Sequence, residues 1–130
     1  MLILKLPFPP STNHSHTYGG GRKFLDKRTR AFREKVQDTV IEQNITKLEG
    51  RLSMFIALFP PDKRRRDIGN YEKQTTDALM NAGVFDDDEQ IDLITIVREE
   101  IVKGGQCVVV LQEIENGENE GFYDELVNGA

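Results

Sequence analysis

Features typical of secreted and membrane proteins are scarce in this sequence. It contains 1 cysteine, so no disulfide can form within the chain. No stretch approaches the ~18 to 20 apolar residues that a membrane-spanning helix needs. The opening segment MLILKLPFPP also lacks the basic region of a secretory signal peptide. We therefore expect an intracellular, cytoplasmic protein whose thiol is reduced.

The 130 residues are most simply one domain. A chain of this length buries roughly two thirds of its unfolded surface in a single core, so folding needs neither a metal nor a disulfide. The cysteine, Cys107, lies in the apolar run 107–111. A thiol in such a run behaves as a small hydrophobic side chain, and we interpret Cys107 as part of the core rather than as a reactive nucleophile.

Acidic residues outnumber basic ones, and the excess lies at the C-terminal end. The formal net charge is -5, from 17 basic and 22 acidic side chains. Residues 113–130 hold many of the acids and no Lys or Arg, so the rest of the chain is nearly neutral. Within it, one basic run occupies 63–66, and an N-terminal group comprises Arg22, Lys23, Lys27, Arg28, Arg30 and Arg33. The overall charge therefore does not exclude a polyanionic partner.

Hydrophobic patterning predicts an element order of β-α-β-α-β-β. Short apolar runs bounded by turn residues predict strands at 2–6, 52–59, 91–101 and 106–114, and helical spacing predicts helices at 27–43 and from 69 or 70 to 82. Gly83 is expected to cap the second helix. Because the run at 52–59 is almost continuously apolar, we expect a central strand covered on both faces. The predicted fold is α/β (α+β): one small domain over residues 1–114, with a mixed sheet and two helices.

Two segments lack a pattern typical of regular structure. Residues 11–23 contain the run Gly19–Gly21, and we expect a mobile loop that ends in basic residues. Residues 115–130 are acidic and rich in Gly and Asn, which predicts a disordered tail. The alternative for the tail is one helical turn that docks on the body or on a neighbour through Phe122, Tyr123, Leu126 and Val127.

The segment richest in chemistry begins with four consecutive cations, Lys63, Arg64, Arg65 and Arg66, which run directly into Asp67. Such a run is often only a solvated loop. Its position after a buried strand and before a carboxylate instead favours contact with phosphates, because clustered cations bind a polyanion and release its counterions. These contacts position a backbone without reading sequence, so selectivity would depend on the shape of the nucleic acid.

An acidic cluster follows the second predicted helix and comprises Asp86, Asp87, Asp88, Glu89 and Asp92. One interpretation is a solvated turn, and the spacing is not that of an EF-hand. Adjacent carboxylates repel one another, however, and a divalent cation or a nearby Arg commonly offsets this repulsion. Together with the carboxylate at 67 and the lysine at 73, the cluster favours metal coordination.

Lys73 stands between these two segments. On the predicted helix it shares a face with Asn70 and Asp77, so one interpretation is a surface pair with Asp77, four residues on. In a phosphoryl-transfer site its ammonium would instead stabilise charge on the phosphate or the leaving oxygen. His14 and His16 give a weaker signal, and we expect them to be solvated or to contact phosphate rather than to bind a metal.

Four segments together resemble the RusA family of Holliday junction resolvases: LPFPPSTNH at 6–14, RRRDIGNYEK at 64–73, DALMNAGVFDDDEQ at 77–90 and KGGQCVVVLQE at 103–113. The resemblance covers nearly the whole body and leaves the acidic tail outside. It implies a small α/β homodimer, typically encoded by phages or prophages, that acts in DNA recombination and repair. Such a protein binds four-way DNA junctions and makes paired nicks in opposing strands with Mg²⁺, or with Mn²⁺ in its place.

The family motif is D-x-D-N with a Lys three residues after the Asn, followed by two Asp shortly before a Gln. The matching positions are Asp67, Asn70, Lys73, Asp87, Asp88 and Gln90. The resemblance implies that Asp67 and Asp88 bind metal, that Asp87 is a ligand or a supporting acid, and that Lys73 is catalytic. DNA contacts are expected from the basic run and from Asn13, Arg22, Lys23 and Asn70.

One position departs from the motif. Gly69 stands where the family has its second, catalytic Asp, which predicts impaired cleavage with junction binding retained. Two origins are open: an engineered or spontaneously inactivated form, or a natural homologue that binds without cutting. The otherwise intact motif favours a recent loss.

The leading hypothesis is a homodimeric, metal-dependent endonuclease that resolves four-way junctions and is impaired at Gly69. A two-fold dimer would present equivalent sites to symmetry-related strands of the junction. The alternative is a non-catalytic protein that binds junctions through the same basic surface, and metal-dependent nicking separates the two. A third hypothesis, a protein-interaction module that uses the acidic tail, predicts no affinity for DNA.

Overall fold

The computed structural model describes residues 1–114, so both expectations for the tail fall on residues outside the described part. The main sheet has four strands in the order β1 (Leu2–Leu6), β6 (Gln106–Glu113), β4 (Leu52–Phe59) and β5 (Ile91–Arg98). β4 and β5 run parallel, and the other neighbouring pairs are antiparallel. Helices α1 (Lys27–Glu42) and α2 (Glu72–Asn81) complete the fold, which confirms the expected α/β (α+β) class with a mixed sheet and two helices.

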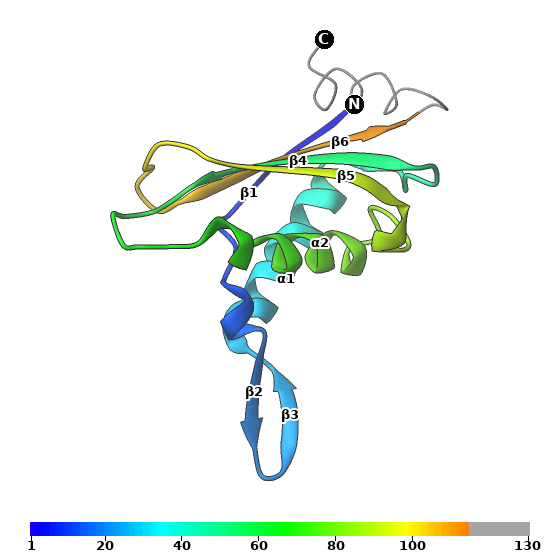
Figure 1. Ribbon diagram of the computed structural model, residues 1–130. Helices are drawn as coiled ribbons and strands as arrows, with labels where there is room; N and C mark the ends of the chain where they lie inside the picture. The colour runs from blue at the N-terminus through cyan, green and yellow to red at the C-terminus, as the bar shows by residue number, and fades with distance from the viewer. Residues whose placement is uncertain (115–130) are drawn as a thin grey trace.

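Both helices pack against one face of this sheet (Figure 1). α1 contributes Phe32, Val36 and Val40, at the four-residue spacing that predicted the helix. Alternate residues of the strands meet them in the core, among them Leu4, Met54, Ile56, Cys107 and Val109. Burial raises the pKa of the Cys107 thiol to about 12, which confirms that this cysteine is a core residue.

The other face of the sheet has no helix over it among residues 1–114 (Figure 1). The strand register aligns Ile3, Val110 and Phe55 in one row across this face, and Phe55 is 37% exposed. The expectation that β4 is covered on both faces is therefore wrong for the described chain. Its nearly continuous apolar sequence arises because the outward side chains of β4 after Ser53 are also apolar, although no helix meets them.

A β-hairpin replaces the loop expected at 11–23. The chain forms a short 3₁₀ helix, η1 (Thr12–His14), and then two antiparallel strands, β2 (His16–Gly19) and β3 (Arg22–Leu25). Gly20 and Gly21 connect the strands with φ of 57° and 76°. Positive φ at both central residues is what a tight type I′ hairpin turn requires. The glycines that suggested irregular structure are therefore the turn residues of a hairpin.

The boundaries of two other elements differ from those expected. A 3₁₀ helix, η2 (Ile68–Asn70), precedes α2, which begins at Glu72, and β5 ends at Arg98 rather than at 101. The cap at Gly83 is confirmed. Gly83 has φ of 80° and donates to the carbonyl of Met80 at 3.0 Å, while Val84 donates to that of Leu79 at 3.0 Å, the pair of bonds that closes a helix C-terminus.

A third 3₁₀ helix, η3 (Asp88–Gln90), leads from α2 into β5. Because β4 and β5 are parallel, the crossover through η2, α2 and η3 carries the chain from the C-terminal end of β4 back to the N-terminal end of β5. No helix in the part of the chain that the structure describes is both long and apolar enough to cross a membrane.

Candidate functional site

The last two cations of the basic run, with Asp67 and Asn70 of the motif, line a cavity of about 300 Å³, which we call the polar cavity. Its other walls come from the N-terminal segment, so Asn13 meets Asp67 and Asn70 although they are far apart in sequence. Thr12 holds the two segments together, because its hydroxyl donates to the carbonyl oxygen of Asn70 at 2.8 Å. The lining residues are Ser11, Asn13, Arg65, Arg66, Asp67, Asn70 and Tyr71.

Asp67 occupies the position before η2 in an extended conformation, and its carbonyl oxygen accepts from the amide of Asn70 at 3.0 Å. Its carboxylate makes no capping hydrogen bond to the backbone of η2. The side chain is exposed and faces the polar cavity with oxygen atoms that the local fold does not use. The Asp67 carboxylate is therefore not used for helix capping and lines the polar cavity.

Gly69 lies in η2, and nothing in the packing requires a glycine there. A Cβ atom placed at Gly69 meets no heavy atom within 4 Å, and its backbone is outside the left-handed region. A Cβ atom at this position therefore meets neither a steric clash nor backbone strain. The glycine at position 69, where the resemblance implies a second Asp, is therefore not explained by a steric or conformational need of this fold.

The four cations of the basic run do not behave alike. Arg66 turns inward: its side chain is 15% exposed, pairs with Asp62 at 2.9 Å and lies 5.6 Å from the centre of the Phe8 ring. The hydrogen bond with Asp62 raises the pKa of Arg66, and the same bond lowers the pKa of Asp62. Arg66 thus anchors the run to the body.

The other three cations project outward. Lys63, Arg64 and Arg65 are exposed, and Arg64 makes only a distant contact of 3.8 Å with Asp62. Within residues 1–114, Lys63 and Arg65 have no ion pair. Of these three, only Arg65 lines the polar cavity.

A second cavity, of about 310 Å³, adjoins the polar cavity and shares Ser11, Arg65, Arg66 and Tyr71 with it. It brings His14 from the end of η1 to the basic run, which fits the expected phosphate contact of this histidine better than metal binding. The rings of Phe8 and Tyr71 pack at 5.0 Å in its wall and hold the N-terminal segment against η2.

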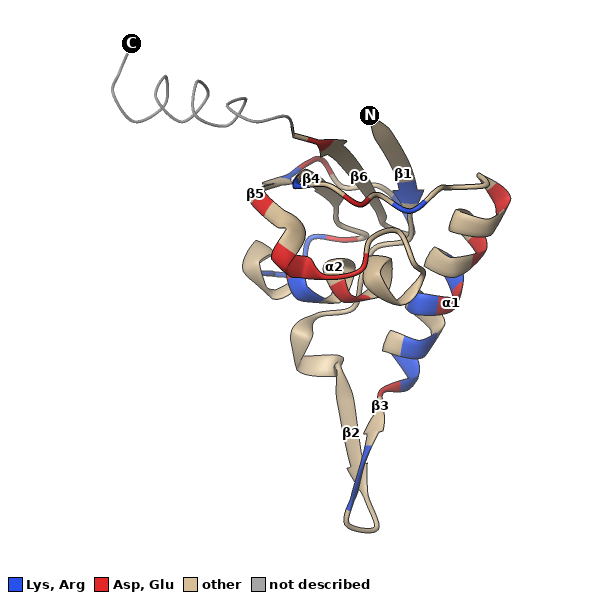
Figure 2. Ribbon diagram, turned by 90° about the vertical axis from the view of Figure 1, so that its right-hand side faces the viewer, with Lys and Arg blue, Asp and Glu red and all other residues tan. Residues whose placement is uncertain are grey.

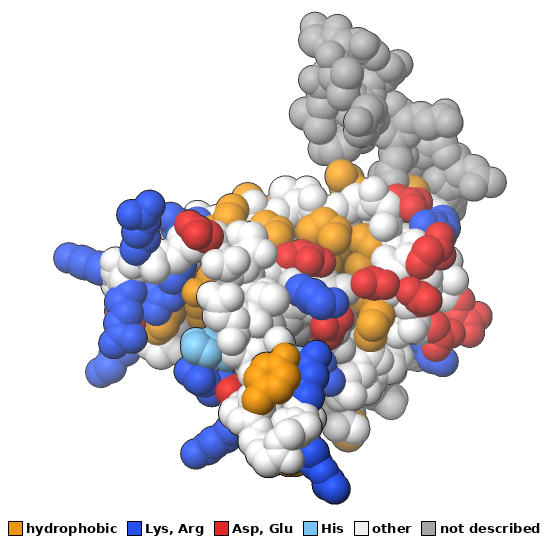
Figure 3. Space-filling model, turned by 60° about the horizontal axis from the view of Figure 1, so that its bottom comes forward, with side chains coloured by type: hydrophobic (Ala, Val, Ile, Leu, Met, Phe, Trp, Pro, Cys, Tyr) orange, Lys and Arg blue, Asp and Glu red, His pale blue; other side chains and the backbone are white. Residues whose placement is uncertain are grey.

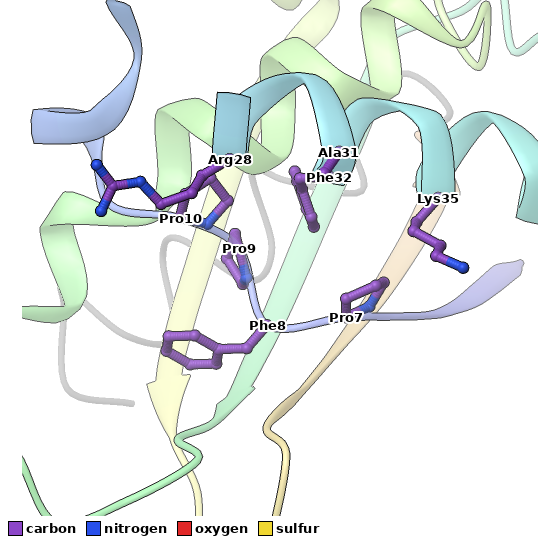
Figure 4. A pocket seen from close by; sticks show the side chains of 8 residues that line it. All are labelled: Pro7, Phe8, Pro9, Pro10, Arg28, Ala31, Phe32 and Lys35. Carbon is purple, nitrogen blue, oxygen red and sulfur yellow. The ribbon is translucent and has the colours of Figure 1, made fainter. Parts of the chain in front are cut away.

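A third cavity lies between the proline-rich segment and α1, and its walls are different in kind (Figure 4). It has about 420 Å³ and is lined mainly by apolar side chains, with two cations among them. The labelled residues are Pro7, Phe8, Pro9, Pro10, Arg28, Ala31, Phe32 and Lys35. No carboxylate borders this cavity, so it offers nothing for metal-dependent chemistry.

Gln90 organises the acidic cluster. Its side-chain oxygen accepts from the amides of Asp86 and Asp87 at 3.0 and 3.1 Å, and its amide nitrogen donates to the carbonyls of Leu48 and Gly50. Asp87 caps η3 by accepting from the amide of Glu89 at 2.9 Å. That backbone bond, with a hydrogen bond to Asp88, lowers the pKa of Asp87. The motif Gln therefore has a structural role.

Cations from another part of the chain neutralise three of the acids. Lys47 pairs with Asp86 at 2.8 Å, and Arg51 pairs with Glu89 at 3.0 Å and with Asp92 at 2.5 Å. The hydrogen bond from Arg51 lowers the pKa of Asp92. The alternative of a nearby Arg thus applies to Glu89 and Asp92, and a lysine takes that place at Asp86. Asp87 and Asp88 have no ion pair within the described residues.

The predicted site residues fall into two groups beside opposite ends of α2. Asp67 precedes the helix, and Asp87 and Asp88 follow it. The helix has 10 residues and so spans about 15 Å. Lys73 lies on its first turn and pairs with Asp77 at 3.4 Å, the contact given above as the alternative to a catalytic role. Asn70 belongs to η2 instead and lines the polar cavity.

A divalent metal fits the donor set at Asp67 in chemical terms. No three His, Cys, Asp or Glu side chains gather in residues 1–114 at a spacing that would hold a metal. Mg²⁺, however, commonly uses one or two carboxylates and completes its shell with waters and substrate phosphates. The polar cavity offers the Asp67 carboxylate and the side-chain amide oxygens of Asn13 and Asn70, all hard oxygen donors.

Basic residues gather on and around the hairpin. In Figure 2 they colour β3 and the N-terminal half of α1, and Figure 3 shows Lys and Arg side chains around the projecting part of the molecule, away from the acidic side. Arg22 and Lys23 are exposed in β3. The two predicted DNA-binding cations of this segment therefore lie on a projecting ribbon, outside the polar cavity.

Comparison with known proteins places this arrangement in a family. The family model described as Endodeoxyribonuclease RusA matches residues 7–110. A protein of Enterobacteria phage HK97 named "Crossover junction endodeoxyribonuclease rusA" is 32% identical over 112 residues, which cover 85% of this chain and 93% of the relative.

Two bacterial relatives agree with this match. The "Crossover junction endodeoxyribonuclease RusA" of Shigella sonnei is 33% identical over 117 residues, covering 87% of this chain and 95% of the relative. The protein of the same name in Escherichia coli K12 is 31% identical over 114 residues, with the same coverage. The resemblance read from the motif segments is confirmed, and the chain belongs to the RusA family of endodeoxyribonucleases.

Proposed function

We propose that this protein is a DNA endonuclease that resolves four-way junctions as a homodimer, with a divalent metal, and that Gly69 impairs its cleavage step. The observation that carries the proposal is the polar cavity, which joins an exposed cation of the basic run to Asp67 and Asn70 of the motif. The names of the phage and bacterial relatives support junction resolution.

In this proposal the exposed cations hold the DNA backbone. Lys63, Arg64 and Arg65 contact phosphates and place one of them over the polar cavity, while Arg66 fixes the run through Asp62 and Phe8. Asp67, with the amide oxygens of Asn13 and Asn70, holds the metal. A divalent cation bound there would supply the Lewis acid that hydrolysis of a phosphodiester requires.

Lys73 and the pair Asp87 and Asp88 keep their proposed roles at other positions. Lys73 would leave its weak surface pair with Asp77 and stabilise negative charge on the phosphate. Asp88, with Asp87 beside it, would bind a second cation near η3. The two groups flank α2, which is about 15 Å long, and no three acidic, His or Cys side chains gather within residues 1–114 at a spacing that would hold a metal; both observations argue for two metal positions in one chain.

A dimer would cover the open face of the sheet. Isolated apolar side chains on a surface are ordinary, but the row of Ile3, Val110 and Phe55 continues across three strands, with Ile3 50% exposed. A second copy of the chain packed on this face would bury the row on both sides of a two-fold axis. That arrangement would also give the two equivalent sites that paired nicking needs.

The second candidate function is junction binding without cleavage, and Gly69 is the observation that favours it. Glycine supplies no carboxylate at position 69, and Asp67 is the one carboxylate that lines the polar cavity. Binding surfaces are unaffected by this change, because the exposed cations lie elsewhere.

One experiment tests both candidates. The intact protein is mixed with a synthetic four-way junction or with a duplex of the same length, with and without Mg²⁺, and both binding and nicking are measured. We expect strong preference for the junction, with slow, Mg²⁺-dependent nicking under the resolvase proposal and none under the alternative. Equal affinity for junction and duplex would contradict both.

A further inference from the structure

The hairpin of β2 and β3 is the least buried part of the described fold, and it projects away from the sheet and helices (Figure 1). Every residue from 16 to 24 is exposed, including two aromatic side chains, Tyr18 at 75% and Phe24 at 50%. A two-stranded hairpin gains little stability from its own contacts. Neither aromatic ring belongs to the core, so folding does not account for them.

The register distributes these side chains evenly over the two faces of the ribbon. Tyr18 lies directly opposite Lys23, and Thr17 lies opposite Phe24. Gly19 is opposite Arg22, on the face that carries Phe24. A Cβ atom at Gly19 would lie 3.9 Å from the Phe24 ring, which confirms that they share a face. Each face therefore presents one aromatic ring and one cation.

The base of the hairpin is fixed, although its tip is exposed. The hydroxyl of Thr17 donates to Asp26 at 3.0 Å, and Asp26 caps α1 by accepting from the amide of Arg28 at 2.8 Å. Below it, the buried Thr29 donates to the carbonyl of His14 at 2.8 Å. The ribbon is thus held at a set position relative to the N-terminal segment that lines the polar cavity.

We propose that this hairpin enters the centre of a four-way DNA junction, where Tyr18 and Phe24 stack on the terminal base pairs of the arms and Arg22 and Lys23 contact the converging phosphates. The inference rests on the proposed function. A continuous duplex offers no free base face inside its stack, whereas the arms of an open junction end at the branch. Aromatic side chains stack on bases without regard to sequence, and cations beside them suit the high phosphate density.

The hairpin would then supply selectivity for shape, and the basic run would supply general affinity. Loss of one base–aromatic stack changes affinity by roughly 5- to 150-fold. This loss should fall on the junction complex alone. Duplex affinity, which uses phosphate contacts of the basic run, should stay within about 2-fold.

The test compares Tyr18→Ser, Phe24→Ser and the double variant with the unchanged protein, in the absence of divalent cations so that only binding is measured. Fluorescence anisotropy gives Kd for a junction and for a duplex of the same length. A 2-aminopurine base next to the branch point reports stacking directly. We expect each single variant to bind the junction at least 5-fold more weakly, to leave duplex binding within about 2-fold, and to lose the 2-aminopurine change.

Two sets of variants control for surface and folding effects. Ile41→Ser removes an exposed apolar side chain of α1, 68% exposed, outside the hairpin, and should change neither Kd. Tyr18→Phe and Phe24→Tyr keep a ring at each position and should retain junction preference, which excludes a general disturbance of the hairpin.

The outcomes separate this inference from the proposed function. If the unchanged protein prefers the junction and the serine variants prefer it equally, the hairpin inference is wrong and the proposed function stands. If the serine variants lose junction and duplex affinity in parallel, the hairpin is a general DNA contact and the inference is again wrong. If the unchanged protein has no preference for the junction, both fail.

Discussion

Replacing Gly69 with Asp tests whether position 69, between the cavity-lining residues Asp67 and Asn70, limits cleavage. The new Cβ meets no heavy atom within 4 Å, and the backbone is not left-handed, so the side chain enters without displacing a neighbour. It adds a second carboxylate two residues from Asp67, in the segment just before α2. Supporting residues of metal sites are worth about 10- to 100-fold in activity, and a direct ligand should exceed that. We expect nicking to rise by well over 100-fold, which corresponds to more than about 2.7 kcal/mol of transition-state stabilisation.

The effect of this substitution on stability should be small and can be separated from its effect on cleavage. Replacing a glycine stabilises the folded protein by about 0.4 to 1 kcal/mol, because the unfolded chain loses conformational freedom. An acid near the start of α2 also interacts favourably with the helix dipole. Gly69→Asn shares the first effect and lacks the charge, so it is the matched control. The assay is single-turnover nicking of a synthetic junction in Mg²⁺. Equal rates for the three proteins would show that position 69 does not limit cleavage and would refute our account of the site.

Four further predictions concern the other parts of the molecule. Arg65→Ala should weaken binding to junctions of any sequence and reduce the slope of log Kd against log salt by about 1, and an unchanged slope would remove Arg65 from the interface. Mg²⁺ should raise the Tm, because a ligand bound only by the folded protein stabilises it. Asp67→Asn and Asp88→Asn should each reduce this rise, and only the double variant should abolish it. Full loss of the rise in either single variant would contradict two metal positions. Phe55→Glu should convert a dimer into a monomer in sedimentation, whereas Ile41→Glu on the exposed side of α1 should not, and a dimer that survives both changes would place the interface elsewhere. Hydrogen bonds from Arg28 lower the pKa of Asp26 to about 2, below its usual value of 3.8, so the contribution of Asp26 to stability is present above pH 4 and is lost as the pH falls towards 2. The difference in Tm between the protein and Asp26→Asn should therefore shrink over that interval. A constant difference would contradict a role of the Asp26 carboxylate in stability.

Periodicity predicted the layers of this fold well, because it reports burial directly. The positions of Phe32, Val36 and Val40 defined α1, and Gly83 marked the end of α2. The hairpin was missed because its Gly run has two meanings, a break in regular structure or a tight turn within it, and only the pairing of Thr17 with Phe24 decides between them.

For the candidate site too, the sequence predicted some features and missed others. Sequence patterns located Asp67, Asn70 and the basic run, and the fold brings the first two and the end of the run into one cavity. They did not reveal that Arg66 is an anchor, since its partner Asp62 and the Phe8 ring are recognisable only in three dimensions. Nor did they reveal the pairing of Arg51 with the acidic cluster, because that contact joins segments about 40 residues apart in sequence and depends on the parallel pairing of β4 with β5.

The buried side chain of Gln74 connects the parts of the molecule that we propose to contact DNA. From α2 it donates to the carbonyl of Ser11 at 3.1 Å and to the hydroxyl of Thr29 at 2.9 Å, and Thr29 in turn holds the carbonyl of His14. The wall of the polar cavity and the base of the hairpin are therefore parts of one rigid frame. With the hairpin at a branch point, this frame would fix the distance from the branch to Asp67. The phosphate that reaches Asp67 would then be selected by that distance and not by the sequence of the bases between.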